Sequence, residues 1–319
     1  MAHKSSKKIV AIGGGTGLFP VLLGLKNHFE SPTAIITMAD DGGSAGILRD
    51  EFEMLPPGDV RRALIALSHS EHKILAELIG YRFKEGTGLA GHSFGNLFLA
   101  ALTRLTGSFE KAIEEASKVL KVQGSVIPVT TDLSRLIAEL EDGTIVKGET
   151  NIDIPRDHNR AKIKKVWLEP KSKANPRALK AITEADLVII GPGDLYTSLV
   201  PNLLVEGVSK ALAATKGKVM YISNCMTKSG ETNGFTASMF LKTISAYLPK
   251  NTIDYVAINT TKPSSTRLKP YARENSWLVE INEKNFGSAP APLYADLLLN
   301  KGLMRYDPEK LATLIKLLV

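Results

Sequence analysis

Short runs of apolar residues alternate along this chain with segments in which apolar residues recur at helical spacing. The runs are rich in β-branched residues, which is typical of buried parallel strands. Most of them end at glycine, acidic or amide residues, where a strand stops and the chain turns. The runs are residues 9–12, 33–39, 186–190, 218–222 and 254–259. This alternation of predicted strands and helices is typical of an α/β fold.

Four other segments depart from this alternation. Helical patterns dominate residues 58–120, which we interpret as a helical insertion. Residues 136–147 contain two short strand patterns around an Asp-Gly turn and predict a β-hairpin that adds antiparallel strands to the main sheet. Residues 260–275 are polar, basic and proline-containing, and we expect a mobile flap there. Residues 1–7 are expected to be disordered.

Composition narrows the class of protein. The chain has 319 residues, 44% hydrophobic and 23% charged, which is ordinary for a globular protein, and without an internal repeat we expect one domain over residues 1–319. No apolar run approaches the roughly 18 to 20 residues of a membrane span. The single cysteine, Cys225, excludes an intramolecular disulfide and fits a reducing compartment, so we predict a cytoplasmic protein. The net charge of +7 is spread out and no nucleic-acid module is recognisable, so no nucleic-acid partner is expected.

The first candidate site is the glycine loop that follows residues 9–12. Glycines allow a sharp turn and a close approach to a ligand, and the first N–H groups of the next helix can bind an anion. The loop is Gly13, Gly14, Gly15, Thr16 and Gly17. It is not a complete nicotinamide fingerprint, because Pro20 stands where the third glycine belongs, and it lacks the lysine of a Walker loop. We therefore expect no nicotinamide or flavin cofactor, and a phosphate group is the natural ligand.

The second candidate site follows residues 33–39 and reads Asp40, Asp41, Gly42, Gly43 and Ser44. Two carboxylates at the end of a strand suit a ribose hydroxyl or Mg²⁺ beside phosphates, while a plain Asp-Gly turn is the alternative. Asp59 is placed either to cap the helix that starts there or to contact the same metal or hydroxyl. Arg61 and Arg62 follow in that helix's first turn, where the helix dipole disfavours cations unless an anion lies nearby.

Three further loops carry polar side chains. Residues 191–198 repeat the arrangement of strand, glycine turn and helix, so two such loops predict a crevice at a topological switch point of the sheet. Asn224 follows the strand at 218–222 and could contact a base or a sugar hydroxyl. In the loop 86–96, Ser93 and Asn96 can cap a helix, and His92 is either an acid or base without an identified partner or a hydrogen-bonded loop histidine.

These motifs, in this order, resemble the gluconeogenesis factor family, often called YvcK-like, a branch of the CofD-like group. The matching stretches are IGGGTGL, ADDGGSAGILRDE, PPGDVRRAL, GTGLAGHSFGN, GPGDLYTSLVPNLL and NCMTKSGET, with a weaker match at RYDPEKLATL. Ile47 and Asp194 stand where the family often has Arg and Ser. The resemblance implies a Rossmann-like, three-layer αβα fold with a mostly parallel sheet, the β-hairpin addition and the helical insertion.

The resemblance also implies a function. Its leading form is a cytoplasmic regulatory protein that binds a nucleotide diphosphate sugar, such as UDP-N-acetylglucosamine, and supports cell shape and wall synthesis under gluconeogenic growth. Homo-oligomers and cell-wall enzyme partners are expected with it. The alternative is a Mg²⁺-dependent CofD-type transferase that moves a phospholactyl-like group from a nucleotide donor to an alcohol. No catalytic residue is assigned.

The site residues expected from these considerations form two sets. Those expected to bind nucleotide or phosphate are Gly13, Gly14, Gly15, Thr16, Gly17, Asp40, Asp41, Gly42, Gly43, Ser44, His92, Ser93, Asn96, Gly191, Gly193, Asp194, Tyr196, Asn224, Tyr271 and Arg305. Those expected at Mg²⁺ are Asp40, Asp41 and Asp59. Tyr271 and Arg305 are included because mobile, basic segments often close over anionic ligands.

Overall fold

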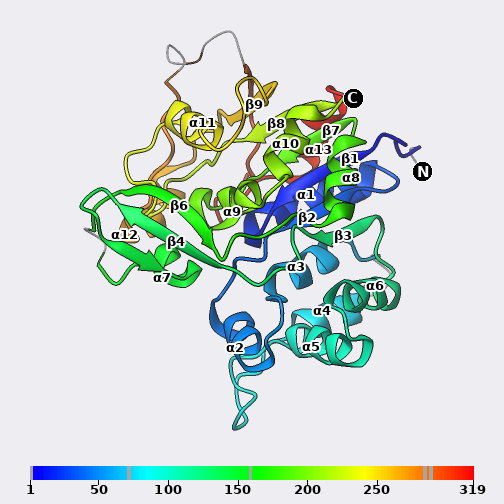
Figure 1. Ribbon diagram of the computed structural model, residues 1–319. Coiled ribbons are helices and arrows are strands. Elements are labelled where there is room, and N and C mark those ends of the chain that lie inside the picture. The colour runs from blue at the N-terminus through cyan, green and yellow to red at the C-terminus, as the bar shows by residue number, and fades with distance from the viewer. Residues whose placement is uncertain (1–2, 70–72, 158–159, 283–285, 287–289) are drawn as a thin grey trace.

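A seven-stranded, all-parallel sheet forms the centre of the molecule in the computed structural model, which describes residues 3–69, 73–157, 160–282, 286 and 290–319 (Figure 1). The strand order is β10-β9-β8-β7-β1-β2-β3. The strands are β1 (Ile9–Gly13), β2 (Thr33–Ile36), β3 (Ser125–Pro128), β7 (Leu187–Ile190), β8 (Lys218–Ile222), β9 (Tyr255–Asn259) and β10 (Ala291–Ala295). β1 and β7 are buried at every position, as expected for strands covered on both faces.

The sheet extends from β1 in both directions, and the chain builds one side before the other. From β1 the chain goes outward through β2 and β3, and it returns at β7 to build the other half of the sheet. β1 pairs in parallel with both β2 and β7, with Ile12 opposite Ile35 and Ile190. The loops after β1 and β7 therefore leave the same edge of the sheet side by side. This confirms the predicted switch point, where open α/β sheets bind their ligands.

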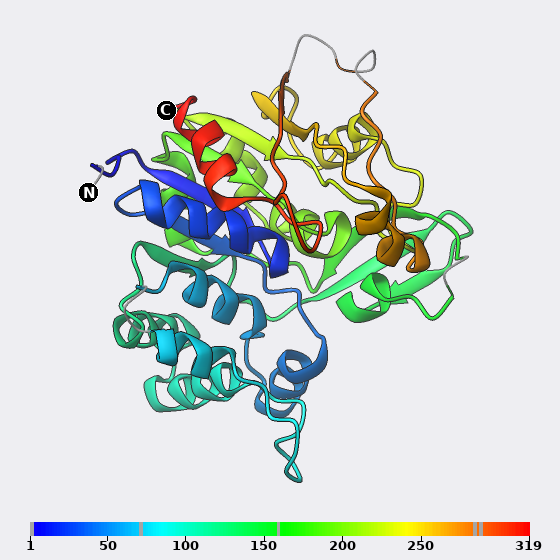
Figure 2. The same ribbon diagram turned by 180° about the vertical axis from the view of Figure 1, so that it is seen from behind.

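Helices cover both faces of the sheet and make three layers. α1 (Gly15–His28), α3 (Gly58–Leu67) and α13 (Pro308–Lys316) lie on one face, as Figure 2 shows. α8 (Pro176–Thr183), α9 (Val200–Leu204) and α10 (Val208–Ala214) lie on the other (Figure 1). Their inward residues join one continuous apolar core with the sheet. The predicted three-layer α/β fold is therefore confirmed.

The segment 58–120 is helical, as predicted. It contains α3, α4 (Lys73–Gly80), α5 (Phe94–Thr106) and α6 (Phe109–Val119), and α2 (Gly43–Phe52) packs beside α5. α3 belongs to the layer on the sheet, whereas α4, α5 and α6 gather below it in Figure 1. Ser93 and Ser108 cap α5 and α6 through their hydroxyl oxygens, which accept the N–H groups of Asn96 and Lys111.

The predicted hairpin forms, but not as part of the main sheet. β4 (Arg135–Leu140) and β5 (Ile145–Lys147) join β6 (Ile163–Glu169) in a separate three-stranded antiparallel sheet of order β5-β4-β6. The Asp-Gly turn is present, with Gly143 at φ +86°. The expectation of added strands in the main sheet is wrong because the buried side of this small sheet packs on α7 (Glu149–Asp153) and α9.

Several boundaries differ from the sequence predictions. β2 ends at Ile36 rather than at residue 39. Residues 265–273 form α12 (Ser265–Arg273), where a mobile flap was expected, and the guanidinium of Arg267 donates to the carbonyls of Gly302 and Leu303. Residues 1–2 lie outside the described part, while Ser5 exchanges backbone hydrogen bonds with His28 and Glu30. Two remaining helical elements are α11 (Ala237–Ser245) and a π-helix (Leu195–Leu199).

No helix in the described ranges is both long and apolar enough to cross a bilayer.

The contact between the two glycine loops is a testable feature of this fold. A Cβ on Gly17 would lie 2.6 Å from the carbonyl oxygen of Pro192 and 2.8 Å from Cα of Gly193, both backbone atoms that cannot rotate away. We expect Gly17→Ala to destabilise the protein by about 1–3 kcal/mol and lower Tm by several degrees, because the loops must separate. Gly80→Ala is the matched control, since its Cβ meets only Ile65 Cδ1 at 3.8 Å. Equal Tm values for both variants, measured by calorimetry, would contradict the contact.

Candidate functional site

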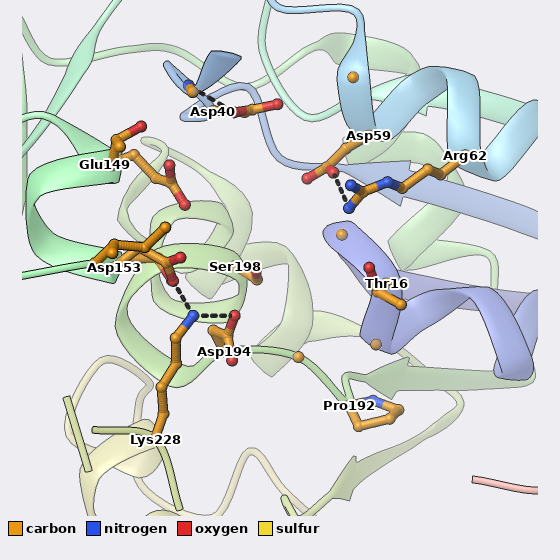
Figure 3. Close-up of a pocket in the computed structure, with 18 of the residues that line it drawn as sticks. Thr16, Asp40, Asp59, Arg62, Glu149, Asp153, Pro192, Asp194, Ser198 and Lys228 are labelled. Atoms are coloured by element: carbon orange, nitrogen blue, oxygen red, sulfur yellow. Dashed lines mark hydrogen bonds and ion pairs between the residues drawn. The ribbon is translucent and has the colours of Figure 1, made fainter. Parts of the chain in front are cut away.

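A cavity of about 830 Å³ opens at the carboxyl edge of the sheet, beside the switch point. Loops after β1, β2, β7 and β8 form its walls, together with α3, α7 and the segments 271–276 and 304–306. In Figure 3, Asp59, Arg62 and Thr16 face Glu149, Asp153 and Lys228 across this space. Both walls are rich in charged groups, so the cavity suits a polar ligand with more than one charged part.

The two glycine loops meet at the floor of the cavity. Gly14 precedes α1 without a side-chain cap, and Asp59 accepts the N–H of Gly15, so the N–H groups of the next residues of the first turn are left for other partners. Gly15 has φ +64°, in the left-handed region that favours glycine. Ser198, from the loop after β7, places its hydroxyl 3.6 Å from where a Cβ of Gly15 would be. This floor combines free backbone donors, a helix N-terminus and a hydroxyl, which together can hold an anion.

Asp59 does not cap α3, because that helix begins at Gly58. Its carboxylate instead accepts the N–H of Gly15 and lies 3.7 Å from the Arg62 guanidinium. A Cβ on Gly14 would lie 2.5 Å from Asp59 Oδ2, so only glycine leaves room for this approach. Burial raises the pKa of Asp59 to about 7, and the nearby Asp40 carboxylate adds to the rise.

Asp40 and Asp41 point in different directions. Asp40 lines the cavity and accepts the N–H of Gly42 at 2.9 Å through Oδ1. Burial also raises the pKa of Asp40. Asp41 turns away and accepts the N–H groups of Glu149 at 3.0 Å and Thr150 at 2.8 Å, which caps α7. Asp41 was expected at Mg²⁺ and phosphate, and the structure corrects this because both of its oxygens are used in the cap.

The opposite wall holds a cluster of carboxylates around one lysine. Lys228 Nζ bonds Asp153 and lies 2.7 Å from Asp194 Oδ2, as Figure 3 shows. It also lies 3.7 Å from Glu231 Oε1. Burial disfavours the ammonium, but the three carboxylates outweigh this and raise the pKa of Lys228. Burial raises the pKa of Glu231 well above its ordinary value, and Asp194 adds to this. Lys228 therefore stays charged and neutralises part of an otherwise repulsive cluster.

Glu149 is a further acid at the cavity. It belongs to α7, and Figure 3 shows it on the same side as Asp153. Burial raises the pKa of Glu149 to about 9, and the negative charges of Asp153 and Asp40 contribute. The carboxyl is therefore largely neutral at pH 7 and can donate a hydrogen bond to a ligand.

His92 has a partner in the structure that the sequence could not identify. Its Nδ1 lies 3.1 Å from Ser44 Oγ, and the Asn96 side-chain amide donates to the same Oγ at 3.1 Å. All three residues are buried, and Ser44 and Asn96 line the cavity. His92 itself does not line the cavity, so its role in the structure is to orient the Ser44 hydroxyl.

Tyr196 is not at the cavity. Its ring is buried in the π-helix and its backbone N–H donates to Glu231 at 3.3 Å, while Thr197 and Ser198, next in the chain, line the cavity instead. The expectation of a base or sugar contact at Tyr196 is therefore corrected: the wide π-helical turn directs its neighbours to the ligand space.

Asn224, Tyr271 and Arg305 do meet at one end of the cavity. Asn224 donates to the carbonyl of Gly193 at 2.8 Å, which ties the β8 loop to the second glycine loop. The Tyr271 hydroxyl accepts the backbone N–H of Met304 at 2.8 Å. Cys225 lies beside them, but burial raises the pKa of its thiol to about 12, so it is no nucleophile at neutral pH.

The predicted residues thus divide into two groups. The cavity is lined by Gly15, Thr16, Gly17, Asp40, Gly42, Gly43, Ser44, Asp59, Asn96, Gly193, Asp194, Asn224, Tyr271 and Arg305. The predicted residues that do not line it are Gly13, Gly14, Asp41, His92, Ser93, Gly191 and Tyr196. The sequence analysis missed Glu149, Asp153, Ser198 and Lys228; only Ser198 and Lys228 carried a signal, since both belong to the motifs that resemble the family.

Fold and site together define a Rossmann-like α/β protein with a charged ligand crevice at its switch point. The family model described as 2-phospho-L-lactate transferase CofD matches residues 9–297. A Thermotoga maritima protein is 44% identical over 97% of this chain and 98% of its own length. The gluconeogenesis factor of Halalkalibacterium halodurans is 43% identical, covering 97% of this chain and 95% of that protein.

A solved structure agrees with the sequence comparisons. The crystal structure of a Bacillus halodurans protein superimposes with a TM-score of 0.93 at 42% identity and covers 98% of this chain and 100% of its own. The chain therefore belongs to the CofD-like family and, within it, to the gluconeogenesis factors, as its motifs predicted.

The lysine at the centre of the acidic cluster offers a stability test. We expect Lys228→Met to destabilise the protein by about 2–4 kcal/mol at pH 8, because three partly buried carboxylates lose their cation. Because burial raises the pKa of Glu231, protonation of this carboxyl at lower pH relieves part of the repulsion, so the loss of Tm should shrink towards pH 5.5. Lys216→Met, at an exposed lysine without an ion pair to any described residue, is the control. If Lys228→Met and Lys216→Met lower Tm equally at both pH values, the role given to Lys228 is refuted.

Proposed function

We propose that this chain is a regulatory protein that binds a nucleotide diphosphate sugar, such as UDP-N-acetylglucosamine, in the switch-point cavity. The observation that carries the proposal is the meeting of two glycine loops, each leading into a helix, at the carboxyl ends of β1 and β7. This arrangement suits a diphosphate, because backbone N–H groups and helix N-termini hold its charge. The volume of about 830 Å³ suits a ligand of nucleotide-sugar size.

The diphosphate would lie between the loop 15–17, the N-terminus of α2 at Gly43 and the loop 192–193. Asn224, Tyr271 and Arg305 line the adjoining end of the cavity and would contact the base or the sugar. Arg305 adds a cation near that end, which suits an anionic ligand. Binding roles are proposed only for the predicted residues that line the cavity.

Mg²⁺ fits the proposal at Asp40 and Asp59. Both carboxylates line the cavity, and Gly58 and Gly14 make room for them, since a Cβ on either glycine would lie 2.5 Å from Oδ2 of Asp40 or of Asp59. Mg²⁺ is typically held by one or two carboxylates together with ligand phosphates. When bound, the ion would neutralise diphosphate charge, while the protein residues fix the position of the nucleotide.

The biological role follows from the relatives. Proteins that match this chain over nearly its whole length are named gluconeogenesis factors, so we propose a role in gluconeogenic growth. Support of cell shape and wall synthesis, a cytoplasmic location, homo-oligomerisation and contacts with cell-wall enzymes remain predictions from the resemblance.

A second candidate function is a Mg²⁺-dependent transferase. It is favoured by the CofD family match and by the two carboxylates that face one space beside the glycine floor. In such a reaction an acceptor hydroxyl oxygen forms a bond to the donor's β-phosphorus, the bond from that phosphorus to the oxygen of the nucleoside monophosphate breaks, and the hydroxyl proton leaves to solvent or a carboxylate.

The leading proposal predicts a thermal shift. UDP-N-acetylglucosamine with Mg²⁺ should raise the Tm of the wild type, since a ligand at a hundredfold excess over Kd stabilises by about 2.7 kcal/mol. Thr16→Phe should abolish the shift, because Thr16 is exposed to the cavity and a large ring would fill the diphosphate position. Thr144→Phe, an exposed site on the small sheet, is the control and should retain it. If millimolar nucleotide sugar leaves the wild-type Tm unchanged, the proposal fails.

The second candidate predicts turnover. A CofD-type transferase would release nucleoside monophosphate from a nucleotide diphosphate donor only with Mg²⁺ and an alcohol acceptor, and Asp59→Asn would reduce kcat at least about a hundredfold. A regulatory binder would release none under any of these conditions. Chromatographic detection of the monophosphate distinguishes the two functions.

A further inference from the structure

Two arginines, Arg61 and Arg82, carry positive charge at the α3 side of the cavity. Arg61 and Arg82 both line the cavity, and no carboxylate in the described ranges forms an ion pair with either. The neighbouring Arg62 pairs with Asp59, which leaves the other two charges unbalanced. Burial lowers the pKa of Arg61 to about 10, and the nearby charges of Arg62 and Arg82 add to the effect. Positive charge is thus concentrated in a buried region, where a charged group is costly in free energy.

Arg61 is buried, and one of its polar atoms is left without a partner. The residue is only 7% exposed, yet Nε has no hydrogen-bond partner among the described residues. A Cβ on Gly95 would lie 2.7 Å from Arg61 Cδ, so this glycine in the first turn of α5 makes room for the arginine stem. A buried guanidinium left unsatisfied in this way is expensive unless a ligand completes it.

A second unsatisfied atom lies next to this glycine. Asn96 is 2% exposed, and its Oδ1 has no partner while its amide nitrogen donates to Ser44 Oγ. His92 fixes that hydroxyl from behind. Arg82 approaches from the other direction, with its backbone bridged to Ser93 and its Nη1 donating to the carbonyl of Gly91. Arg61 packs against Gly95 and Arg82 is bridged to Ser93, so both arginines contact the chain next to Asn96, and all three residues line the cavity.

We infer that Arg61, Arg82, Asn96 and Ser44 form a second oxyanion subsite, occupied by an anion that carries an O–H group and is bound alongside the nucleotide. The arginines pair with the charged oxygens and Asn96 Oδ1 accepts from the O–H. Monohydrogen phosphate has this chemistry at neutral pH, whereas a simple carboxylate and the dianion of a phosphomonoester lack the O–H. The inference goes beyond the proposed function and relies on it only for the nucleotide in the other half of the cavity.

The test uses inorganic phosphate as the probe, with acetate at the same concentration for comparison. The protein is first saturated with UDP and Mg²⁺, which fills the diphosphate position, and phosphate is then titrated by calorimetry and by Tm. Variants Arg82→Gln and Arg61→Gln each remove one charge; Arg82 is exposed, so its variant folds even if the buried Arg61 variant does not. Arg104→Gln, at an exposed arginine on α5 outside the cavity, is the control.

We expect phosphate to bind the UDP-saturated wild type and the Arg104 variant, acetate to bind at least about tenfold more weakly, and each subsite variant to lose about tenfold or more in phosphate affinity. Equal phosphate affinity in the wild type and in Arg82→Gln, or no phosphate binding by the wild type, would overturn the inference. If UDP itself does not bind, the nucleotide proposal fails. The same comparison of variants on the nucleotide-free protein then decides whether this subsite exists.

Discussion

The rest of this structure depends on a close backbone contact between two turns that are 175 positions apart, at Gly17 and Pro192. The contact is possible because β1 and β7 are hydrogen-bonded neighbours and because residue 17 lacks a Cβ. It closes the floor of the crevice and places the N-terminus of α1 beside the hydroxyl of Ser198. The position of the cavity is therefore determined first by the topology of the sheet and only second by the side chains.

Charge is the second constraint on the cavity. Burial raises the pKa values of Asp59, Glu149 and Glu231, and it lowers that of Arg61. Lys228 offsets one group of acids and Arg62 offsets another, but neither wall is fully neutralised within the protein. The phosphates of a ligand would offset the excess positive charge, and a cation bound with them would offset the excess negative charge. The protein is less stable without a complementary ligand in this cavity than with one. In this respect a binding site differs from a hydrophobic core.

Local sequence patterns were sufficient to predict the layers of the fold and the positions of the glycine loops. Apolar runs of β-branched residues predicted five of the seven sheet strands, and glycines marked the loops that meet at the switch point. β10 was missed because Pro292 argues against a strand, although an edge position such as this one tolerates proline. The hairpin could be predicted from its Asp-Gly turn. Its place in a separate sheet could not, because the packing of that sheet on α9 is a tertiary contact.

The roles of single side chains required the fold. Asp40 and Asp41 are adjacent and chemically identical, and only the N-terminus of α7, more than a hundred residues later, determines which one faces the cavity. Lys228 was missed as a site residue because two of its three carboxylates, Asp153 and Asp194, come from distant segments. Tyr196 was misplaced because a π-helical turn, which has no clear local signature, rotates it into the core.

The most direct test of the central claim is a crystal structure of the protein with UDP and Mg²⁺. The account predicts that the diphosphate lies against residues 15–17 and 192–193, with the ion between it, Asp40 and Asp59. A diphosphate bound at Arg61 and Arg82 instead, or a nucleotide outside the cavity, would contradict it.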